Sequence, residues 1–464
     1  MSPKFFLAVF ITSVGSGFQH GYHTGVVNIP AEVIREWISL LKTLHEDSTE
    51  LDVIWSTTVA IFSLGGIIGS LMIGFFGDTC GRKRSLFWNN FIILAAIPVM
   101  AFSKKTESFV MFLSGRFFSG INASLNAGLC QMYLTEISPD KIRGAVGSLY
   151  HFVYVCSIVM SQIAGFLLGS DENWPYIFVI PAFPALLQLF LLPFCPESPK
   201  FLLITQGKDS EATKSLQKLR GREDITHELR LLEEEDSLVK QMRGSSLKMI
   251  FQNPAMANAL LCCIVLNMAQ QMCGINMIVY YSTHIFDEMK VGALESLFLI
   301  VGMSTFSVII TLGSVLTVDS LGRRTLIEIS LLGLIVTTIL MIFSFQFFEY
   351  GLCSMKYFYI CSVYLFNGFH SVGLGTIPRF ITAEMFPHTS RTIAICVTLA
   401  VSWSANFLIG EGALILRREI RSYICIIYIF LDLVFFLILR QRLPETSKLS
   451  AKEIISMYEY NREQ

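Results

Sequence analysis

Neutral amide side chains gather in one apolar stretch of the chain, at Gln270, Gln271 and Asn276. An amide both donates and accepts hydrogen bonds, so it matches a hydroxyl group, which does the same. One such bond contributes about 1 kcal/mol net, and millimolar binding needs only about 4 kcal/mol. These amides, which Gly274 could turn inward by breaking the helix, predict a site for a small hydroxyl-rich molecule. The alternative is that they join neighbouring helices.

Acidic and basic residues recur at the same spacing in the two halves of the sequence. Glu136 lies seven residues before Arg143, and Glu384 lies seven residues before Arg391. Such pairs can hold two halves together in one state and separate in another, which makes them a latch. The alternative is that they only cap helix ends. The residues predicted to form gating salt bridges are Arg82, Glu136, Arg143, Glu197, Arg323, Arg324, Glu384 and Arg391.

Two further motifs repeat in the same order. The segment 78–83, DTCGRK, matches 319–324, DSLGRR, which lies 241 positions later. The segment 196–199, PESP, matches 444–447, PETS, which lies 248 positions later. These repeats predict that one unit was duplicated in parallel, as in transporters whose halves are related by an axis along the membrane normal.

The composition requires a lipid environment. Hydrophobic residues make up 53% of the 464 positions and charged residues 15%, whereas a soluble domain has about 25% charged residues. Lys and Arg number 35 and Asp and Glu 36, so no net field attracts nucleic acid or another polyanion. The 11 cysteines are scattered without a CxxC pair, which indicates small apolar packing residues and no metal site.

Apolar stretches long enough to cross a bilayer, about 20 residues each, occur in two groups of six. They cover roughly 5–28, 54–77, 86–103, 107–135, 144–168 and 174–194, then roughly 256–286, 293–318, 325–345, 355–386, 392–416 and 422–443. All twelve must be helices, because lipid offers no partner for an open strand edge. The predicted division is an N-terminal half at 1–199, a linker at 200–252, a C-terminal half at 253–443 and a tail at 444–464.

Two regions differ from plain spanning helices. The linker alternates charges with leucines at helical spacing, which predicts short amphipathic helices on the cytosolic face; a solvated linker is the alternative. In the tenth span, Gly373, Gly375 and Pro378 would break the helix, because proline destabilises a helix by about 3 kcal/mol locally. Such a span could bend while the others rotate as rods.

Basic residues in the short loops set the expected orientation. They concentrate after spans two, four, eight and ten, which the positive-inside rule places in the cytosol together with both termini. The loop between spans eleven and twelve is an exception, since Arg417, Arg418 and Arg421 fall on the opposite side.

These motifs resemble the sugar-porter branch of the major facilitator superfamily, and within it the facilitative glucose transporter family. The matching segments are 21–25 (GYHTG), 115–117 (GRF), 196–199 (PESP), 270–276 (QQMCGIN) and 444–446 (PET). The resemblance implies an all-α membrane protein with twelve transmembrane helices in two six-helix halves. It also adds Trp403 and Asn406 to the amides at the substrate site. The segment 78–83 is closer to relatives that carry fructose or urate.

Several positions depart from the family pattern. His151 and Ser307 stand where the family site has a glutamine and an asparagine, and Ser371 and Arg379 replace a glutamate and a tryptophan. Two interpretations of Arg379 are open, because a guanidinium at membrane depth must be paired or wetted. It could face a water-filled cavity and favour an anionic substrate such as urate. It could instead pair with Glu384 while the cavity takes a neutral hexose, which is the interpretation we expect.

Histidines in the spans carry weaker predictions. By resemblance, His23 stands near Arg116 at a position where proton-coupled relatives have an aspartate. His23 and Arg116 are therefore the candidates for proton coupling. Because Arg116 would keep His23 neutral, we expect passive transport instead. His20 and His370 are expected to be hydrogen-bonded residues of helix packing.

The expected function is passive transport of a hexose, glucose or fructose or both, by alternating access. No GxSxG, HExxH or Walker motif is present, so neither an enzyme nor a cofactor is expected. Transport of an anionic substrate such as urate and a sugar sensor without transport remain alternatives. The expected partners are the sugar and the lipid bilayer, not nucleic acid, and the oligomeric state is left open. The resemblance implies a multi-pass protein of the plasma membrane.

Overall fold

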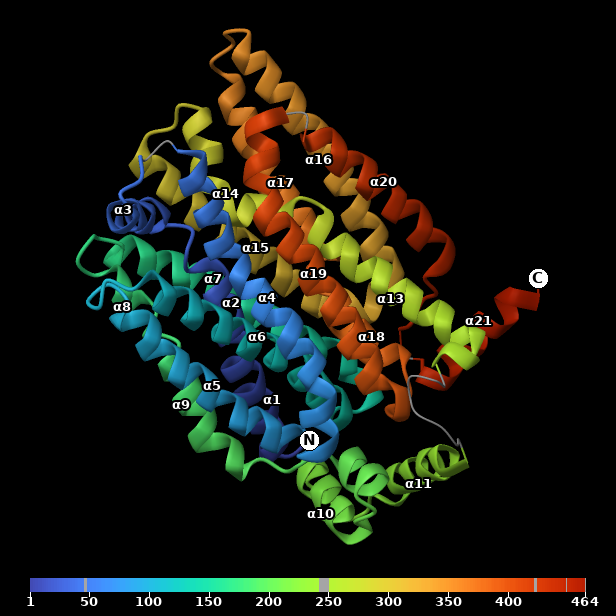
Figure 1. Ribbon diagram of the computed structural model, residues 1–464. Helices are drawn as coiled ribbons and strands as arrows, with labels where there is room; N and C mark the ends of the chain where they lie inside the picture. The colour runs from blue at the N-terminus through green and yellow to red at the C-terminus, as the bar shows by residue number, and fades with distance from the viewer. Residues whose placement is uncertain (46–47, 242–249, 421–423, 448, 464) are drawn as a thin grey trace.

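A computed structural model describes residues 1–45, 48–241, 250–420, 424–447 and 449–463. Throughout this part of the chain every regular element is a helix. Figure 1 shows the N-terminal helices, blue to green, beside the C-terminal helices, yellow to red. The helices α10 (Asp209–Arg220) and α11 (Thr226–Gln241) lie together at one end of the bundle. We call this the linker end, and the end that carries α3 (Ala31–Lys42) the far end.

The remaining elements follow the predicted spans. The first half contains α1 (Pro3–Thr12), η1 (Ser13–Gly17), α2 (Phe18–Gly25), α4 (Thr49–Thr79), α5 (Arg82–Phe102), α6 (Phe109–Ile137), η2 (Asp140–Ile142), α7 (Arg143–Leu168), α8 (Trp174–Ile177), α9 (Ala182–Leu191) and η3 (Leu192–Phe194). After η4 (Phe201–Thr205), the second half contains α13 (Pro254–Met272), α14 (Ile275–Glu288), α15 (Ala293–Leu321), α16 (Arg323–Glu349), α17 (Met355–Val372), α18 (Pro378–Met385), α19 (His388–Ile420) and α20 (Ile424–Arg442), followed by α21 (Ala451–Glu463).

Each of the twelve predicted spans coincides with one or more helices in the described residues. Nine of them are long and apolar enough on their own to cross a membrane. The other three are α1–η1–α2, α6 and α17–α18, which contain breaks or buried polar residues. The predicted helices of the linker are present as α10 and α11, while residues 242–249 of the linker lie outside the described residues. Of the loop that was the exception to the positive-inside rule, Arg421 and the side chains of Arg417 and Arg418 also lie outside the described residues.

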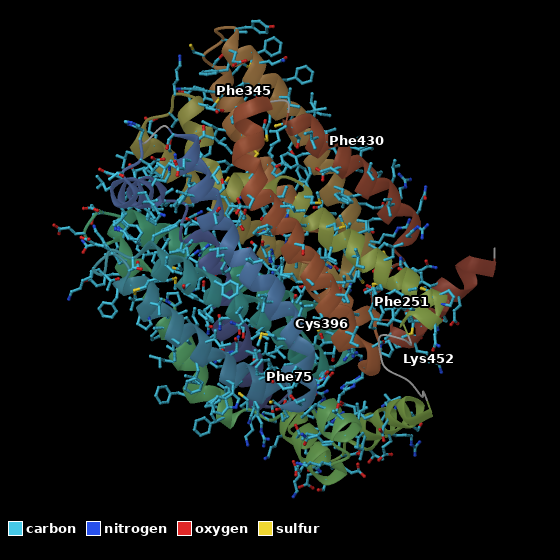
Figure 2. All side chains as sticks on the ribbon, in the orientation of Figure 1. Phe75, Phe251, Phe345, Cys396, Phe430 and Lys452 are labelled. Carbon is cyan, nitrogen blue, oxygen red and sulfur yellow. The ribbon has the colours of Figure 1, made fainter. Side chains whose placement is uncertain are left out.

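The outside of the bundle is apolar. Phe75 on α4 and Phe430 on α20 are among the large hydrophobic side chains that are exposed (Figure 2). Extensive exposed apolar surface is rare on soluble monomers, and a spanning helix needs it where it meets lipid. The amphipathic helix α3, which was not predicted, buries Ile34 and Trp37 at the far end.

The seventh span breaks where the sequence predicts. Helix α13 ends at Met272, α14 begins at Ile275, and Gly274 between them has φ +98°. A residue with a side chain is strained at this φ. A Cβ on Gly274 would also lie 3.1 Å from the ring of Tyr428. Glycine is therefore required at the break that turns the amide segment.

Replacing Gly274 with alanine is expected to destabilise the protein by about 1–2 kcal/mol, the cost of a left-handed backbone for an L-residue. The midpoint of thermal unfolding in detergent should fall by several degrees. The matched control is Gly313→Ala in α15, where a Cβ would meet nothing within 4 Å. Equal melting midpoints for the two variants would contradict the requirement.

The repeated proline–glutamate motifs have the same structural role in each half. The Glu197 carboxylate accepts a hydrogen bond from the backbone N–H of Lys83 (3.0 Å) at the start of α5. The Glu445 carboxylate accepts from the backbone N–H groups of Arg323 (2.9 Å) and Arg324 (3.1 Å) at the start of α16. An acidic group at a helix N-terminus caps free N–H groups and complements the helix dipole. Burial raises the pKa of Glu197, and the backbone hydrogen bonds from Lys83 and Ser198 oppose that shift.

Candidate functional site

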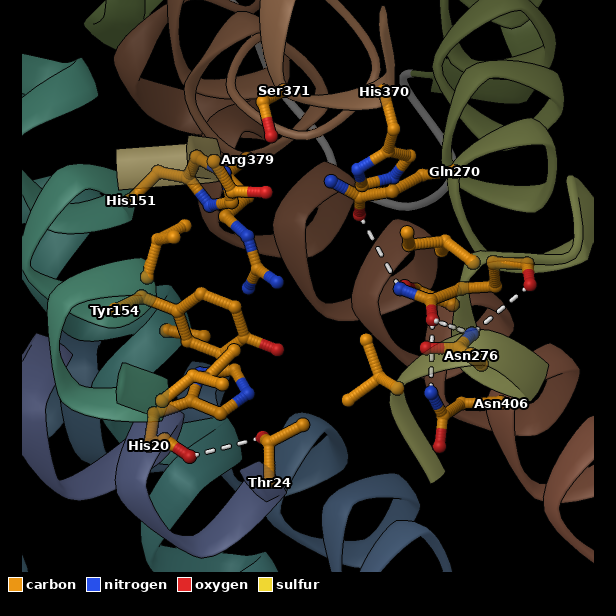
Figure 3. Close-up of a pocket in the computed structure, with 18 of the residues that line it drawn as sticks. His20, Thr24, His151, Tyr154, Gln270, Asn276, His370, Ser371, Arg379 and Asn406 are labelled. Carbon is orange, nitrogen blue, oxygen red and sulfur yellow. Dashed lines mark hydrogen bonds between the residues drawn. The ribbon is translucent and has the colours of Figure 1, made fainter. Parts of the chain in front are cut away.

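A cavity lies between the two halves, with α2 and α7 on one side and α13–α14, α17–α18 and α19 on the other (Figure 3). Its volume is about 90 Å³. This is room for several water molecules. The eight residues that the sequence assigned to the substrate site all line it: Gln270, Gln271, Asn276, His151, Ser307, Arg379, Trp403 and Asn406. The fold therefore brings together residues from four spans of the C-terminal half and one of the N-terminal half.

Gln271 is the centre of an amide network in this cavity. Its Nε2 donates to Ser402 Oγ (3.0 Å), and its Oε1 accepts from Asn276 Nδ2 (2.8 Å) and Asn406 Nδ2 (2.9 Å). Asn406 Oδ1 in turn accepts from the Tyr280 hydroxyl (3.1 Å). Each of these groups both donates and accepts, so a hydroxyl-bearing guest can replace the bonds they make with one another.

Gln270 connects this network to the break in the tenth span. Its Nε2 donates to the backbone carbonyls of Leu374 (2.8 Å) and Gly375 (3.0 Å), which lie between α17 and α18. Those carbonyls have lost their helical partners at the predicted break, so the amide satisfies them. Gln270 also accepts a hydrogen bond from Gln271 Nε2 (3.3 Å), which joins the cavity wall to the break between α17 and α18.

Aromatic and histidine side chains form the opposite wall. The ring of Tyr154 lies 5.5 Å from that of His151, and His20 lies 5.3 Å from the ring of Trp403. The His20 Nδ1 is 2.7 Å from the Tyr150 hydroxyl. The hydrogen bond predicted for His20 is present, and both His20 and His370 also line the cavity, which the sequence did not predict.

The structure overturns the expected pairing of Arg379 with Glu384. The Glu384 carboxylate lies 3.1 Å from the guanidinium of Arg323 instead. The guanidinium of Arg379 lines the cavity and lies 4.4 Å from the ring centroid of Tyr154. The physical reason is helix geometry: both residues belong to α18, where a separation of five positions puts their side chains about 140° apart around the axis and about 7.5 Å apart along it. Arg379 therefore faces the cavity at the start of α18, and Glu384 lies beside Arg323 near its end.

His23 and Arg116 are neighbours but do not line the cavity. The Arg116 guanidinium donates to the backbone carbonyl of His23 (2.8 Å) and lies 4.8 Å from the ring centroid of Phe62. Within the described residues, the two ring nitrogens of His23 have no hydrogen-bond partner. His23 is completely buried.

An ion network joins the two halves at the linker end. The Glu136 carboxylate lies 3.0 Å from Arg82 Nε in its own half and 3.7 Å from Arg391 Nη1 in the other half. His388 Nε2 of the second half lies 3.6 Å from Glu136 and 3.3 Å from Arg82 Nη2. The carboxylate of Glu136 is fully buried, so this network differs from an exposed surface pair.

A related network surrounds Arg323. It lies 2.8 Å from Asp319 within its own half, and Asp319 accepts a hydrogen bond from the backbone N–H of Ala145 in the other half (3.1 Å). Arg143 begins the helix that approaches this site, and its charge acts on Glu384. The other two predicted gating residues remain within one half: Glu197 caps α5, and Arg324 lies 3.1 Å from Glu328.

The halves also touch at the far end, where Asn28 Nδ2 donates to Ser282 Oγ (2.8 Å). Contacts therefore cross between the halves at both ends of the cavity. In between, α4 packs against α19 and α7 against α15. A cavity between two halves that touch at both ends is the arrangement of a carrier of the major facilitator type.

Comparison with known proteins agrees with this class. The family model "Sugar (and other) transporter" matches residues 8–458. The chain is 35% identical over 461 residues to facilitated glucose transporter member 1 of solute carrier family 2 from Gallus gallus, covering 98% of this chain and 93% of the relative. It is 36% identical over 466 residues to member 3 from Mus musculus, covering 99% and 94%.

Solved structures agree on the fold. The proton:xylose symporter XylE bound to 6-bromo-6-deoxy-D-glucose superposes with a TM-score of 0.86 at 21% identity, covering 98% of this chain and 99% of that one. The inward open conformation of XylE from E. coli gives 0.74 at 22% identity, with the same coverage. This chain belongs to the facilitated glucose transporter family, within the sugar transporters of the major facilitator superfamily. It is a membrane-embedded sugar transporter and not an enzyme.

Proposed function

We propose that the protein carries neutral hexoses, glucose and fructose, down their gradients by alternating access. The observation that supports this most is the Gln271 network: four neutral hydrogen-bonding groups converge on the space between two halves that touch at both ends. A hexose hydroxyl can replace any of the hydrogen bonds that these groups make with one another. Relatives named as facilitated glucose transporters support the choice of glucose.

In this proposal, the buried networks around Glu136 and Asp319 hold the linker end closed, and the Asn28–Ser282 bond holds the far end. The guest binds from one side, and one set of contacts breaks while the other forms. The bonds from Gln270 to the backbone between α17 and α18 would transmit occupancy of the cavity to the bending segment.

We further infer that transport is passive. At the position that the family resemblance assigns to proton coupling, His23 is buried outside the cavity lining with Arg116 beside it. We also propose the plasma membrane as the location and the cytosol for the linker end. The basic residues Arg82, Arg323 and Arg391 gather there, as the positive-inside rule favours.

Uptake of labelled glucose and fructose into proteoliposomes tests the proposal. With no ion gradient, the internal sugar should rise to the external concentration and no further, and an unbuffered external medium should keep its pH. If the internal sugar exceeds the external concentration under an inward proton gradient and the medium becomes alkaline, the protein is a proton symporter and not a uniporter. Binding of either sugar without any uptake would indicate a sensor.

Replacing Gln271 with leucine tests the amide network. The variant loses the hydrogen-bonding centre of the site, and each bond contributes about 1 kcal/mol, so KM for glucose should rise about tenfold. The control is Gln162→Leu in α7, a buried glutamine that does not line the cavity. An unchanged KM in the Gln271 variant would exclude the network from substrate binding.

A further inference from the structure

Arg379 brings a positive charge into the cavity. It is the second residue of α18, directly after the break in the tenth span. Figure 3 shows its guanidinium directed into the pocket between Tyr154 and the amide wall of Gln270 and Asn276. The carbon of the guanidinium lies 4.4 Å from the Tyr154 ring centroid, so one face of the group is held by a cation–π contact.

This charge has no counter-ion among the described residues. No aspartate or glutamate lines the cavity. Glu384, the nearest carboxylate along the chain, is occupied by Arg323, and the Nε of Arg379 is buried without a hydrogen-bond partner. The three histidines that line the cavity, His20, His151 and His370, can only be neutral or positive.

An unpaired guanidinium in the middle of a membrane protein is costly unless water or an anion compensates it. The contact with Tyr154 offsets only about 1–2 kcal/mol of that cost. A carboxylate is the natural complement, because its two oxygens match two parallel N–H donors of the guanidinium. The cavity therefore has two parallel N–H donors for an anion on one side and hydroxyl-matching amides on the other.

We infer that the preferred guest is a sugar acid: a hexose ring whose hydroxyls meet the network of Gln271, Asn276 and Asn406 and whose carboxylate meets Arg379. A hexuronate such as D-glucuronate has this chemistry. The inference rests on the proposed function, since it keeps the same cavity, the same sugar ring and the same passive cycle and adds a carboxylate to the preferred guest. It commits to a sugar acid because the amide wall is built for several hydroxyls, which a flat anion such as urate does not offer.

The test compares uptake of labelled D-glucuronate, D-glucose and urate into proteoliposomes with the membrane potential clamped at zero. Wild-type protein should carry glucuronate with a KM at least tenfold lower than that for glucose. In Arg379→Gln, the ratio of glucuronate to glucose uptake should fall at least tenfold, and Arg379→Lys should keep part of it. The control is Arg35→Gln, which removes an arginine that pairs with Asp52 away from the cavity.

A second measurement uses wild-type protein alone, so it does not depend on how the variants fold. D-Glucuronate should inhibit glucose uptake at least tenfold more strongly than D-glucuronamide, its uncharged counterpart. Equal inhibition by the two compounds, an unchanged uptake ratio in Arg379→Gln, or uptake of urate without glucuronate would overturn the inference. Glucose uptake without glucuronate uptake would overturn it and leave the proposed function standing, whereas failure to carry any sugar would overturn both.

Discussion

Replacing Glu136 with glutamine is expected to reduce the rate of transport at least tenfold. The buried carboxylate lies within ion-pair distance of Arg82 and, across the halves, of Arg391 and His388. Removing one partner of a buried ion network leaves uncompensated charge and costs about 3–5 kcal/mol. That cost is borne by the state in which the linker end is closed, so the protein should remain open at this end and cycle slowly.

Labelling of Cys396 would report the opening. Its Sγ lies against Gly74, 3.6 Å from where a Cβ on that glycine would be, in the seam between α4 and α19. A soluble thiol reagent should modify Cys396 faster in Glu136→Gln than in the wild type. The control is Glu328→Gln, which removes a half-exposed partner of Arg324 within one helix and should change neither measurement. Normal transport and labelling in the Glu136 variant would show that the network is no latch.

Replacing Gly144 with alanine is expected to prevent close approach of the halves at the second network. A Cβ at this position would lie 2.3 Å from Arg323 Nη2 and 2.3 Å from Asp319 Oδ1. Neither group can move aside cheaply, because Arg323 is held by Glu384 and Asp319 accepts from Ala145. Overpacking of this kind costs about 1–3 kcal/mol, so the closed linker end should lose about tenfold or more in population.

The matched control is Gly74→Ala, another glycine at the seam between the halves, where the nearest atom to the added Cβ is 3.6 Å away. Glucose uptake should fall several-fold in Gly144→Ala and stay near wild type in Gly74→Ala. Equal uptake by the two variants would mean that the halves do not meet closely at Gly144 during the cycle.

The sequence predicted the spans and the cavity residues for physical reasons that act locally. Twenty apolar residues must form a helix in lipid. The break at position 274 has φ +98°, which only glycine adopts without strain. The amides at 270, 271 and 276 then follow the break into the cavity. The repeated motifs could also be recognised in the sequence, since both proline–glutamate segments cap the helix that begins at the repeated Gly-Arg pair.

The partners of charged residues could not be predicted in the same way. Glu384 lies five positions after Arg379 in the same helix α18, so the two side chains point about 140° apart around its axis, and Glu384 pairs with Arg323 from a distant motif. His20 and His370 resembled packing residues because each lies in a largely apolar span. The position of His370 just before the Gly373–Pro378 break was the available signal, since an opened helix exposes its neighbours to the cavity.

Counterflow is the measurement that tests the central claim most directly. Proteoliposomes loaded with unlabelled glucose are diluted into a trace of labelled glucose, and the label inside is followed over time. A carrier whose cavity faces one side at a time predicts a transient rise of internal label above its equilibrium value, and the Gln271→Leu variant should show a smaller rise at the same sugar concentration. A steady approach to equilibrium without overshoot, or no entry of label at all, would contradict an enclosed sugar site that alternates between the two sides.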